Sequence, residues 1–159
     1  EIIYRDIWYI PFIIIGFHPI MIAMMHQFNL IYQFWPHTDW IGKLGWFDKV
    51  FNSPSNHRVH HSSNLKEMDK NYGGIFMIWD HLFGTYKSEE RHVKNYGILH
   101  NISTHNVFHI VFDEFSTMIR DVKKAPDLRS KLSYIFNAPG WKHQGKDERI
   151  STLQNELKE

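Results

Sequence analysis

Three histidines stand close together in the run "NHRVHHSSN", residues 56–64, at positions His57, His60 and His61. On a helix, residues three and four apart share one face, so the three imidazoles would point toward one volume. Neutral imidazole nitrogens are common ligands of iron, zinc and copper. The spacing therefore favours a metal site over a solvated, histidine-rich turn.

Two earlier histidines, His26 and His37, are further candidate ligands. They lie eleven residues apart toward the end of a stretch without charge, where a polar ring is costly and usually functional. On a continuous helix the two would share a face, but Pro36 interrupts such a helix. For His26, the alternative is a hydrogen bond to backbone inside a packed bundle.

Polar residues that follow the histidines could hold the second ring nitrogen of each ligand. A ligating histidine usually has that nitrogen bonded to a carboxylate, a carbonyl or water. Near enough in sequence for this role are Asn64, Asp69, Asn71 and Asp80. Asp69 and Asn71 could instead cap a helix or shape the turn before Gly73.

An apolar segment precedes the histidine run and would have to anchor it. No Asp, Glu, Lys or Arg occurs between Asp6 and Asp39, and "IWYIPFIIIGFHPIMIAMM" fills residues 7–25. Because a helix needs about 20 apolar residues to cross a bilayer, we expect one membrane segment here, at about 7–25. The alternatives are a buried core helix or a re-entrant hairpin broken at Gly16–Pro19.

The remaining chain favours helices over strands. Two sets of apolar residues fall at helical spacing on either side of Pro126: Val111, Phe115, Met118, Ile119 and Val122, then Leu128, Leu132, Ile135 and Phe136. We predict a mainly α fold, a membrane-embedded helical bundle with histidine-bearing helices and C-terminal amphipathic helices at the membrane interface. The expected division is 1–106 and 107–159, with a polar tail that frays from Lys142 onward.

The composition excludes several classes of protein. The chain has no cysteine, which rules out disulfides, cysteine-bound zinc and cysteine-bound iron–sulfur clusters. Its net charge of +1 gives no reason to expect nucleic acid as a partner. The H-E-x-x-H pattern of zinc proteases is absent. A histidine-rich site attached to a membrane segment favours redox metal chemistry over hydrolysis.

Longer motifs extend this interpretation to a family. "NHRVHHSSN" followed by "DKNYGGIFMIWDHLFGTY" resembles the last histidine box and signature of the fatty acid hydroxylase/sterol desaturase superfamily. "HQFNLIYQFWPHT" and "NAPGW" resemble its sterol-desaturase-like branch, which also includes alkylglycerol monooxygenase.

The resemblance implies an integral membrane, non-haem di-iron enzyme. Such enzymes hydroxylate or desaturate a lipid or sterol with O₂ and electrons from a reductase, a cytochrome b5-like donor or a pterin. By resemblance, His57, His60 and His61 form the last box, while His37 and His26 match intermediate histidines. The implied location is the bacterial inner membrane or the endoplasmic reticulum, with the metal site facing the cytoplasm.

The chain departs from the family pattern because two earlier histidine boxes are missing. We expect them upstream of Glu1, so this chain would carry part of a ligand set. Two rival functions stay open at this point. One is a non-catalytic, membrane-associated metal-binding protein. The other is a zinc hydrolase with His57, His60 and His61 as ligands.

Overall fold

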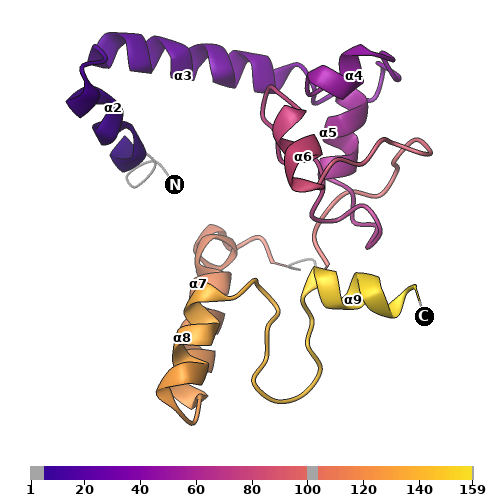
Figure 1. The fold of residues 1–159 in the computed structure, drawn as a ribbon. Helices are drawn as coiled ribbons and strands as arrows, with labels where there is room; N and C mark the ends of the chain where they lie inside the picture. Colours follow the sequence, from indigo (N-terminus) through magenta and orange to yellow (C-terminus); the bar gives the residue numbers. More distant parts are fainter. Residues whose placement is uncertain (1–5, 100–103, 159) are drawn as a thin grey trace. The chain divides into compact units, whose positions relative to one another are not determined.

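Helices and connecting loops make up the computed structural model, which describes residues 6–99 and 104–158 (Figure 1). Over these residues the backbone forms two isolated β-bridges and no strand, so the prediction of a mainly α fold is confirmed. The chain divides into two compact units. Among the described residues, the first comprises 6–60 and 70–93, and the second comprises 61–69, 94–99 and 104–158.

The apolar N-terminal segment forms a 3₁₀-helix, η1 (Asp6–Tyr9), and two α-helices, α2 (Ile10–Ile15) and α3 (Pro19–Phe34). Gly16 ends α2 with φ of 110°, a left-handed conformation that glycine adopts without strain. The expected membrane segment at about 7–25 is therefore not one continuous helix, and its insertion into a membrane stays a prediction. In the part of the chain that is described, no helix is both long and apolar enough to cross a bilayer.

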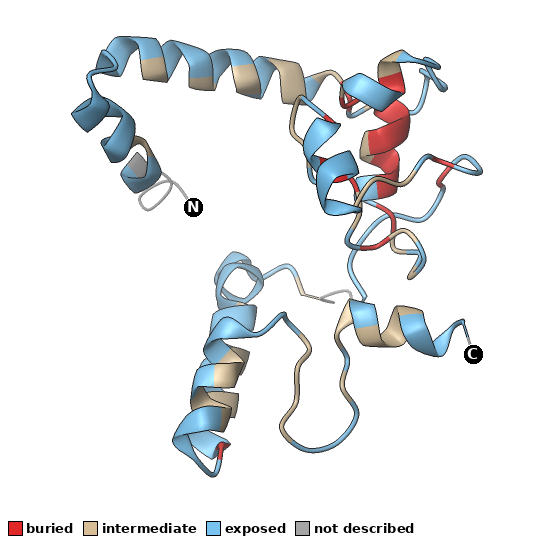
Figure 2. Ribbon diagram, in the orientation of Figure 1, coloured by how far each residue is buried: buried red, intermediate tan, exposed pale blue. Residues whose placement is uncertain are grey.

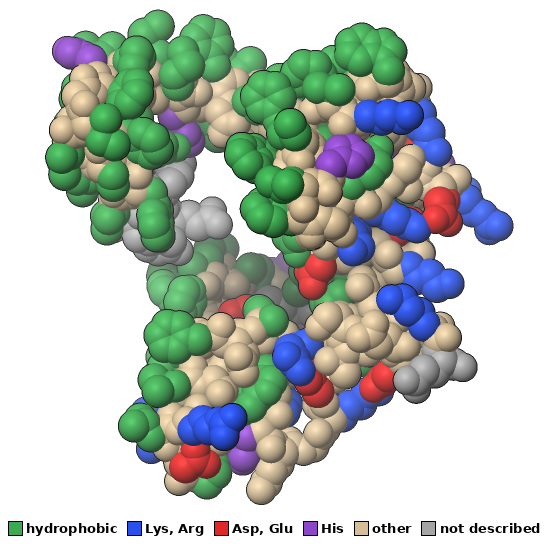
Figure 3. All heavy atoms as spheres, in the orientation of Figure 1, with side chains coloured by type: hydrophobic (Ala, Val, Ile, Leu, Met, Phe, Trp, Pro, Cys, Tyr) green, Lys and Arg blue, Asp and Glu red, His purple; other side chains and the backbone are tan. Residues whose placement is uncertain are grey.

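Helices α2 and α3 contain no buried residue. Hydrophobic side chains cover both helices in the space-filling view (Figure 3). Ile14 at 79% exposure and Phe34 at 81% show how little of this surface is covered within the unit. An apolar face of this extent is typical of a surface that contacts lipid or another protein segment.

Three short helices contribute buried residues to the core of the first unit: α4 (Phe47–Val50), α5 (Pro54–His60) and α6 (Ile78–Phe83). Figure 2 shows buried residues concentrated along α5. The Ser53 hydroxyl accepts the N–H of Asn56 at 3.4 Å. With Pro54 at the first helical position, this bond makes a favourable helix start.

Buried side-chain amides join α5 to the segments beside it. The Asn56 amide donates to the carbonyls of Asp48 at 2.6 Å and Phe51 at 3.2 Å. The Asn71 amide donates to the carbonyls of Asn56 at 3.1 Å and Lys87 at 2.8 Å. Since buried backbone oxygens need partners, these two asparagines fix the loops around the histidine-bearing helix.

The second unit contains α7 (Val107–Lys124), α8 (Leu128–Phe136) and α9 (Ile150–Glu156). Helices α7 and α8 pack against each other, and Asn106 and Asp127 cap their N-termini through side-chain oxygens. Both amphipathic helices were predicted from their apolar spacing. The tail was predicted to fray, but it forms α9, where the Gln154 amide donates to the carbonyls of Leu65 and Met68.

Candidate metal centre

Two histidines from distant parts of the sequence meet at the centre of the candidate site. His57 lies on α5, and His37 lies three residues beyond the end of α3. Their Nε2 atoms are 2.8 Å apart, and the ring centroids are 4.1 Å apart with an interplanar angle of 76°. Each ring therefore presents the edge that carries Nε2 to the other.

A backbone carbonyl selects the tautomer of the His37 ring. Its Nδ1–H donates to the carbonyl of Gln33 at 2.8 Å, because a carbonyl oxygen can only accept. In the neutral ring, Nε2 then carries a lone pair, and the His57 Nε2–H donates to it. A carbonyl on Nδ1 with Nε2 turned into the site is the arrangement that ligating histidines use.

His61 completes a group of three. It directly follows the last residue of α5, so the end of that helix sets its position. One ring nitrogen from each of His37, His57 and His61 lies within 4.8 Å of the others, and His57 is the most buried of the three. Two imidazole nitrogens that share an ion at about 2.0–2.1 Å lie roughly 3 Å apart in a cis arrangement. The donor set and its spacing fit a metal ion.

His60 was predicted to join this group, and its ring nitrogens lie outside it. Its Nδ1–H donates to the carbonyl of Lys70 at 3.2 Å, and its ring stacks on His57 with centroids 5.6 Å apart. Helical spacing thus brings two of the three residues of the run to one point. The third lies beside them with its ring held by the backbone.

His26 lies on α3, away from the group of three. Its Nδ1 is 3.0 Å from the Tyr9 hydroxyl, and both residues line a largely apolar cavity of about 390 Å³ together with Phe12, Phe17 and Met25. His26 and His37 were both predicted as metal ligands. Only His37 lies in the described cluster, and a ligand role for His26 stays a prediction.

Four polar residues were predicted to support the histidines, and that role stays a prediction. Asp80 is buried and accepts the N–H groups of Tyr72 and Gly73 and the Thr85 hydroxyl. Asn71 bonds to Asn56 and Lys87. Asn64 accepts the N–H of Lys66, and Asp69 is exposed with φ of 57°. Asp80 and Asn71 thus fix the segment that presents the Lys70 carbonyl to His60.

A buried ion pair beside the histidines was missed by the sequence analysis. Arg58, directly after His57, donates from Nε and Nη2 to the two carboxylate oxygens of Glu89, both at 2.8 Å. Burial of Glu89 raises the pKa of its carboxyl. The hydrogen bonds from Arg58 and the Val93 N–H, together with the nearby positive charge, outweigh burial and leave that pKa below its ordinary value. No sequence pattern links residues 31 positions apart.

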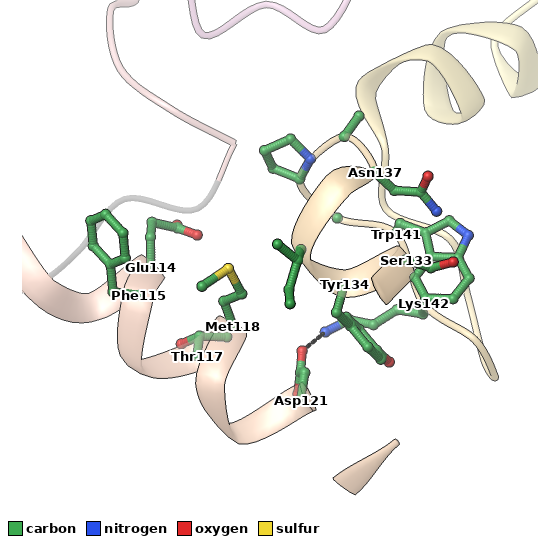
Figure 4. Close-up of a pocket in the computed structure, with 14 residues that line it drawn as sticks. Glu114, Phe115, Thr117, Met118, Asp121, Ser133, Tyr134, Asn137, Trp141 and Lys142 are labelled. Atoms are coloured by element: carbon green, nitrogen blue, oxygen red, sulfur yellow. Dashed lines mark hydrogen bonds and ion pairs between the residues drawn. The ribbon is translucent and has the colours of Figure 1, made fainter. Parts of the chain in front are cut away.

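A separate cavity of about 240 Å³ lies between α7, α8 and the loop that follows α8 (Figure 4). Met118, Tyr134 and Trp141 line it, and the Lys142 ammonium bonds to the Asp121 carboxylate at 3.0 Å on its wall. That hydrogen bond raises the pKa of Lys142. Among the described residues, only the group of His37, His57 and His61 has the donors and spacing of a metal site.

Comparisons with known proteins identify the family of this chain. A sequence profile of the fatty acid hydroxylase family matches residues 1–85. Alkylglycerol monooxygenase of Homo sapiens is 42% identical over 123 residues, which cover 77% of this chain and 27% of that protein. The Caenorhabditis elegans alkylglycerol monooxygenase is 40% identical over 137 residues, with 79% and 27% covered.

A bacterial protein shares a shorter region. An ornithine lipid hydroxylase of Rhizobium tropici is 43% identical over 49 residues, 31% of this chain and 15% of that protein. The chain spans 27% of the length of the alkylglycerol monooxygenases it resembles. No solved structure matches the chain. The profile match covers more than half of the sequence and includes His37, His57 and His61, so the chain belongs to the fatty acid hydroxylase family.

Proposed function

We propose that this chain is the histidine-bearing part of an iron-dependent lipid monooxygenase. The observation that carries the proposal is the convergence of His37, His57 and His61 in a member of the fatty acid hydroxylase family. Relatives named alkylglycerol monooxygenase and ornithine lipid hydroxylase support a lipid as substrate. An alkylglycerol is the first substrate to test.

The chain's own residues have defined roles in this proposal. His37 and His57 offer Nε2, and His61 offers a third ring nitrogen. The Gln33 carbonyl keeps the proton of His37 on Nδ1, so that Nε2 is available. Metal binding at the same point would require the His57 proton to move from Nε2, the atom that contacts His37. Iron held there would supply the O₂ activation that cleavage of an unactivated C–H bond requires.

The overall reaction sets what else the full-length protein must provide. Monooxygenation consumes a C–H bond, O₂, two electrons and two protons, and yields the alcohol and water. The electrons come from an external donor, for which a pterin, a reductase or a cytochrome b5-like protein are the proposed classes. Three histidines do not saturate an iron pair. We propose that His60, His26 or residues elsewhere in the full-length protein supply the other ligands.

We also propose that the site stands at a membrane surface. Residues 7–38 carry no charged side chain, and α2 and α3 expose apolar side chains along their lengths. A pair of helices interrupted at Gly16 fits a hairpin that enters the bilayer from one side better than a straight crossing. Helix α7 has a continuous apolar face, which suits an interfacial position. A lipid substrate would then reach the histidines from the bilayer.

Isotope labelling of the full-length protein tests the proposed reaction. The purified protein is supplied with Fe²⁺, an alkylglycerol, an electron donor and ¹⁸O₂, and the product is analysed by mass spectrometry. One ¹⁸O atom in the oxidised lipid supports monooxygenation. Label that enters only from H₂¹⁸O would identify a hydrolase, and full iron loading without lipid turnover would favour a non-catalytic metal-binding protein.

A further inference from the structure

We infer that the buried pair of Arg58 and Glu89 is a positioning device that holds His37 against His57. The inference rests on the proposed metal site and adds to it two residues that are not ligands. Both side chains are 4% exposed. Arg58 is peptide-bonded to His57, and the loop whose carbonyls Arg58 binds begins one residue after His37.

The hydrogen bonds of Arg58 connect three parts of the first unit. Nε and Nη2 bind both carboxylate oxygens of Glu89 at 2.8 Å. Nη1 donates to the carbonyls of Thr38 at 3.0 Å and Ile41 at 2.9 Å. Glu89 also accepts the N–H of Val93 at 3.1 Å. The guanidinium thus closes the 38–41 loop onto α5, while the carboxylate fixes the guanidinium.

Chemistry explains why this position is an arginine. Only a guanidinium presents several donors in one rigid plane, so it can bind a carboxylate with two nitrogens and still offer a third to carbonyls. Lysine has a single ammonium and cannot cover the same set. His37 itself lies outside any helix. Its Nδ1–H binds the Gln33 carbonyl and its backbone N–H binds the Phe34 carbonyl, while Arg58 binds the carbonyls of the loop that follows. Because ring nitrogens must be placed within a few tenths of an ångström to share an ion, loosening this loop should weaken metal binding.

The test uses Glu89→Gln and Arg58→Lys in the full-length protein, with Glu90→Gln as the matched control. Glu90 is the next residue, and its carboxylate pairs with Lys87 at the surface, where its side chain is 73% exposed. Co²⁺ titration gives the metal affinity and the d–d absorption spectrum. Hydrogen exchange of the 37–41 amides in the metal-free protein reports the loop directly.

We expect Co²⁺ to bind about 10–100-fold more weakly to Glu89→Gln and Arg58→Lys, the range typical for groups that support metal ligands. The Co²⁺ spectrum should shift, and the 37–41 amides should exchange faster, while Glu90→Gln matches the wild type. A purely structural role would lower the melting temperature of Arg58→Lys and leave its Co²⁺ spectrum and affinity unchanged. That result would overturn the inference.

The two readouts separate this inference from the proposed function. If wild-type protein takes up no Co²⁺ at the histidines, the proposed metal site fails, and hydrogen exchange still tests whether the pair orders the loop. If the wild type binds Co²⁺ and Glu89→Gln retains wild-type exchange at 37–41, the positioning role fails and the metal site stands.

Discussion

The Nε2 atoms of His37 and His57 lie 2.8 Å apart, although 20 positions separate the two residues in the chain. Two elements create this contact. Helix α5 presents His57, and the loop after α3 turns His37 back toward it with Nδ1 on the Gln33 carbonyl.

The ion pair of Arg58 and Glu89 should make the free energy of unfolding depend on pH at values below the usual pKa of a glutamate. The pKa of Glu89 lies below its usual 4.5 in the folded protein. Its contribution is therefore fully present above pH 4.5 and declines as the pH falls through the lowered folded pKa. Glu89→Gln should cost about 3–5 kcal/mol at neutral pH, because it leaves a buried guanidinium without its counter-charge.

Urea unfolding of wild type and Glu89→Gln at pH 7 and at decreasing pH below 4.5 measures this difference. The gap between the two proteins should narrow as the pH falls. A gap that is constant down to pH 3 would mean that the carboxylate charge does not support the fold.

Among the carboxylates, Asp80 should contribute most to the stability of the segment that follows the histidines. It accepts two backbone N–H groups and the Thr85 hydroxyl while 2% exposed. In Asp80→Asn, an amide N–H₂ must face one of these donors, which should cost about 1–3 kcal/mol. Asp69→Asn is the control, because asparagine tolerates the left-handed backbone at that exposed position. Equal unfolding free energies for the two variants would contradict this role.

Gly73 should not accept a side chain. A Cβ there would lie 2.3 Å from the Phe76 carbonyl oxygen and 2.9 Å from Asp80 Oδ2. Backbone must move to relieve that clash, so Gly73→Ala should destabilise the protein by about 1–3 kcal/mol. Gly42→Ala is a matched control, since nothing lies within 4 Å of its Cβ. Thermal unfolding of both variants tests the prediction, which fails if Gly73→Ala melts with the wild type.

Local sequence signals account for much of the fold. The apolar spacing and the caps at Asn106 and Asp127 are enough to predict α7 and α8, because periodicity and N-terminal capping act within a few residues. Gly16 and Pro19 allowed a broken helix as an alternative to one continuous segment. Helix α9 was missed because long-range bonds from Gln154 to Leu65 and Met68 support it.

The candidate site was predictable only in part. The histidine run gave His57 and His61, and a motif resemblance supported His37. The spacing also suggested His60, whose ring binds the Lys70 carbonyl and lies outside the group. Side-chain types do not reveal a hydrogen bond to a backbone carbonyl. The pairing of Arg58 with Glu89 depends on how loops fold back onto α5, and neither residue stands in a pattern that reveals it.

Iron content of the full-length protein tests the central claim most directly. The comparison is between wild type, His57→Ala and His81→Ala, each purified with Fe²⁺ and assayed for bound iron and lipid oxidation. His81 is a fair control, because its Nε2–H binds the Lys49 carbonyl and its ring stacks on Tyr86. We expect His57→Ala to lose bound iron and oxidation together, while His81→Ala retains both. Full iron loading and wild-type oxidation in His57→Ala would contradict the account.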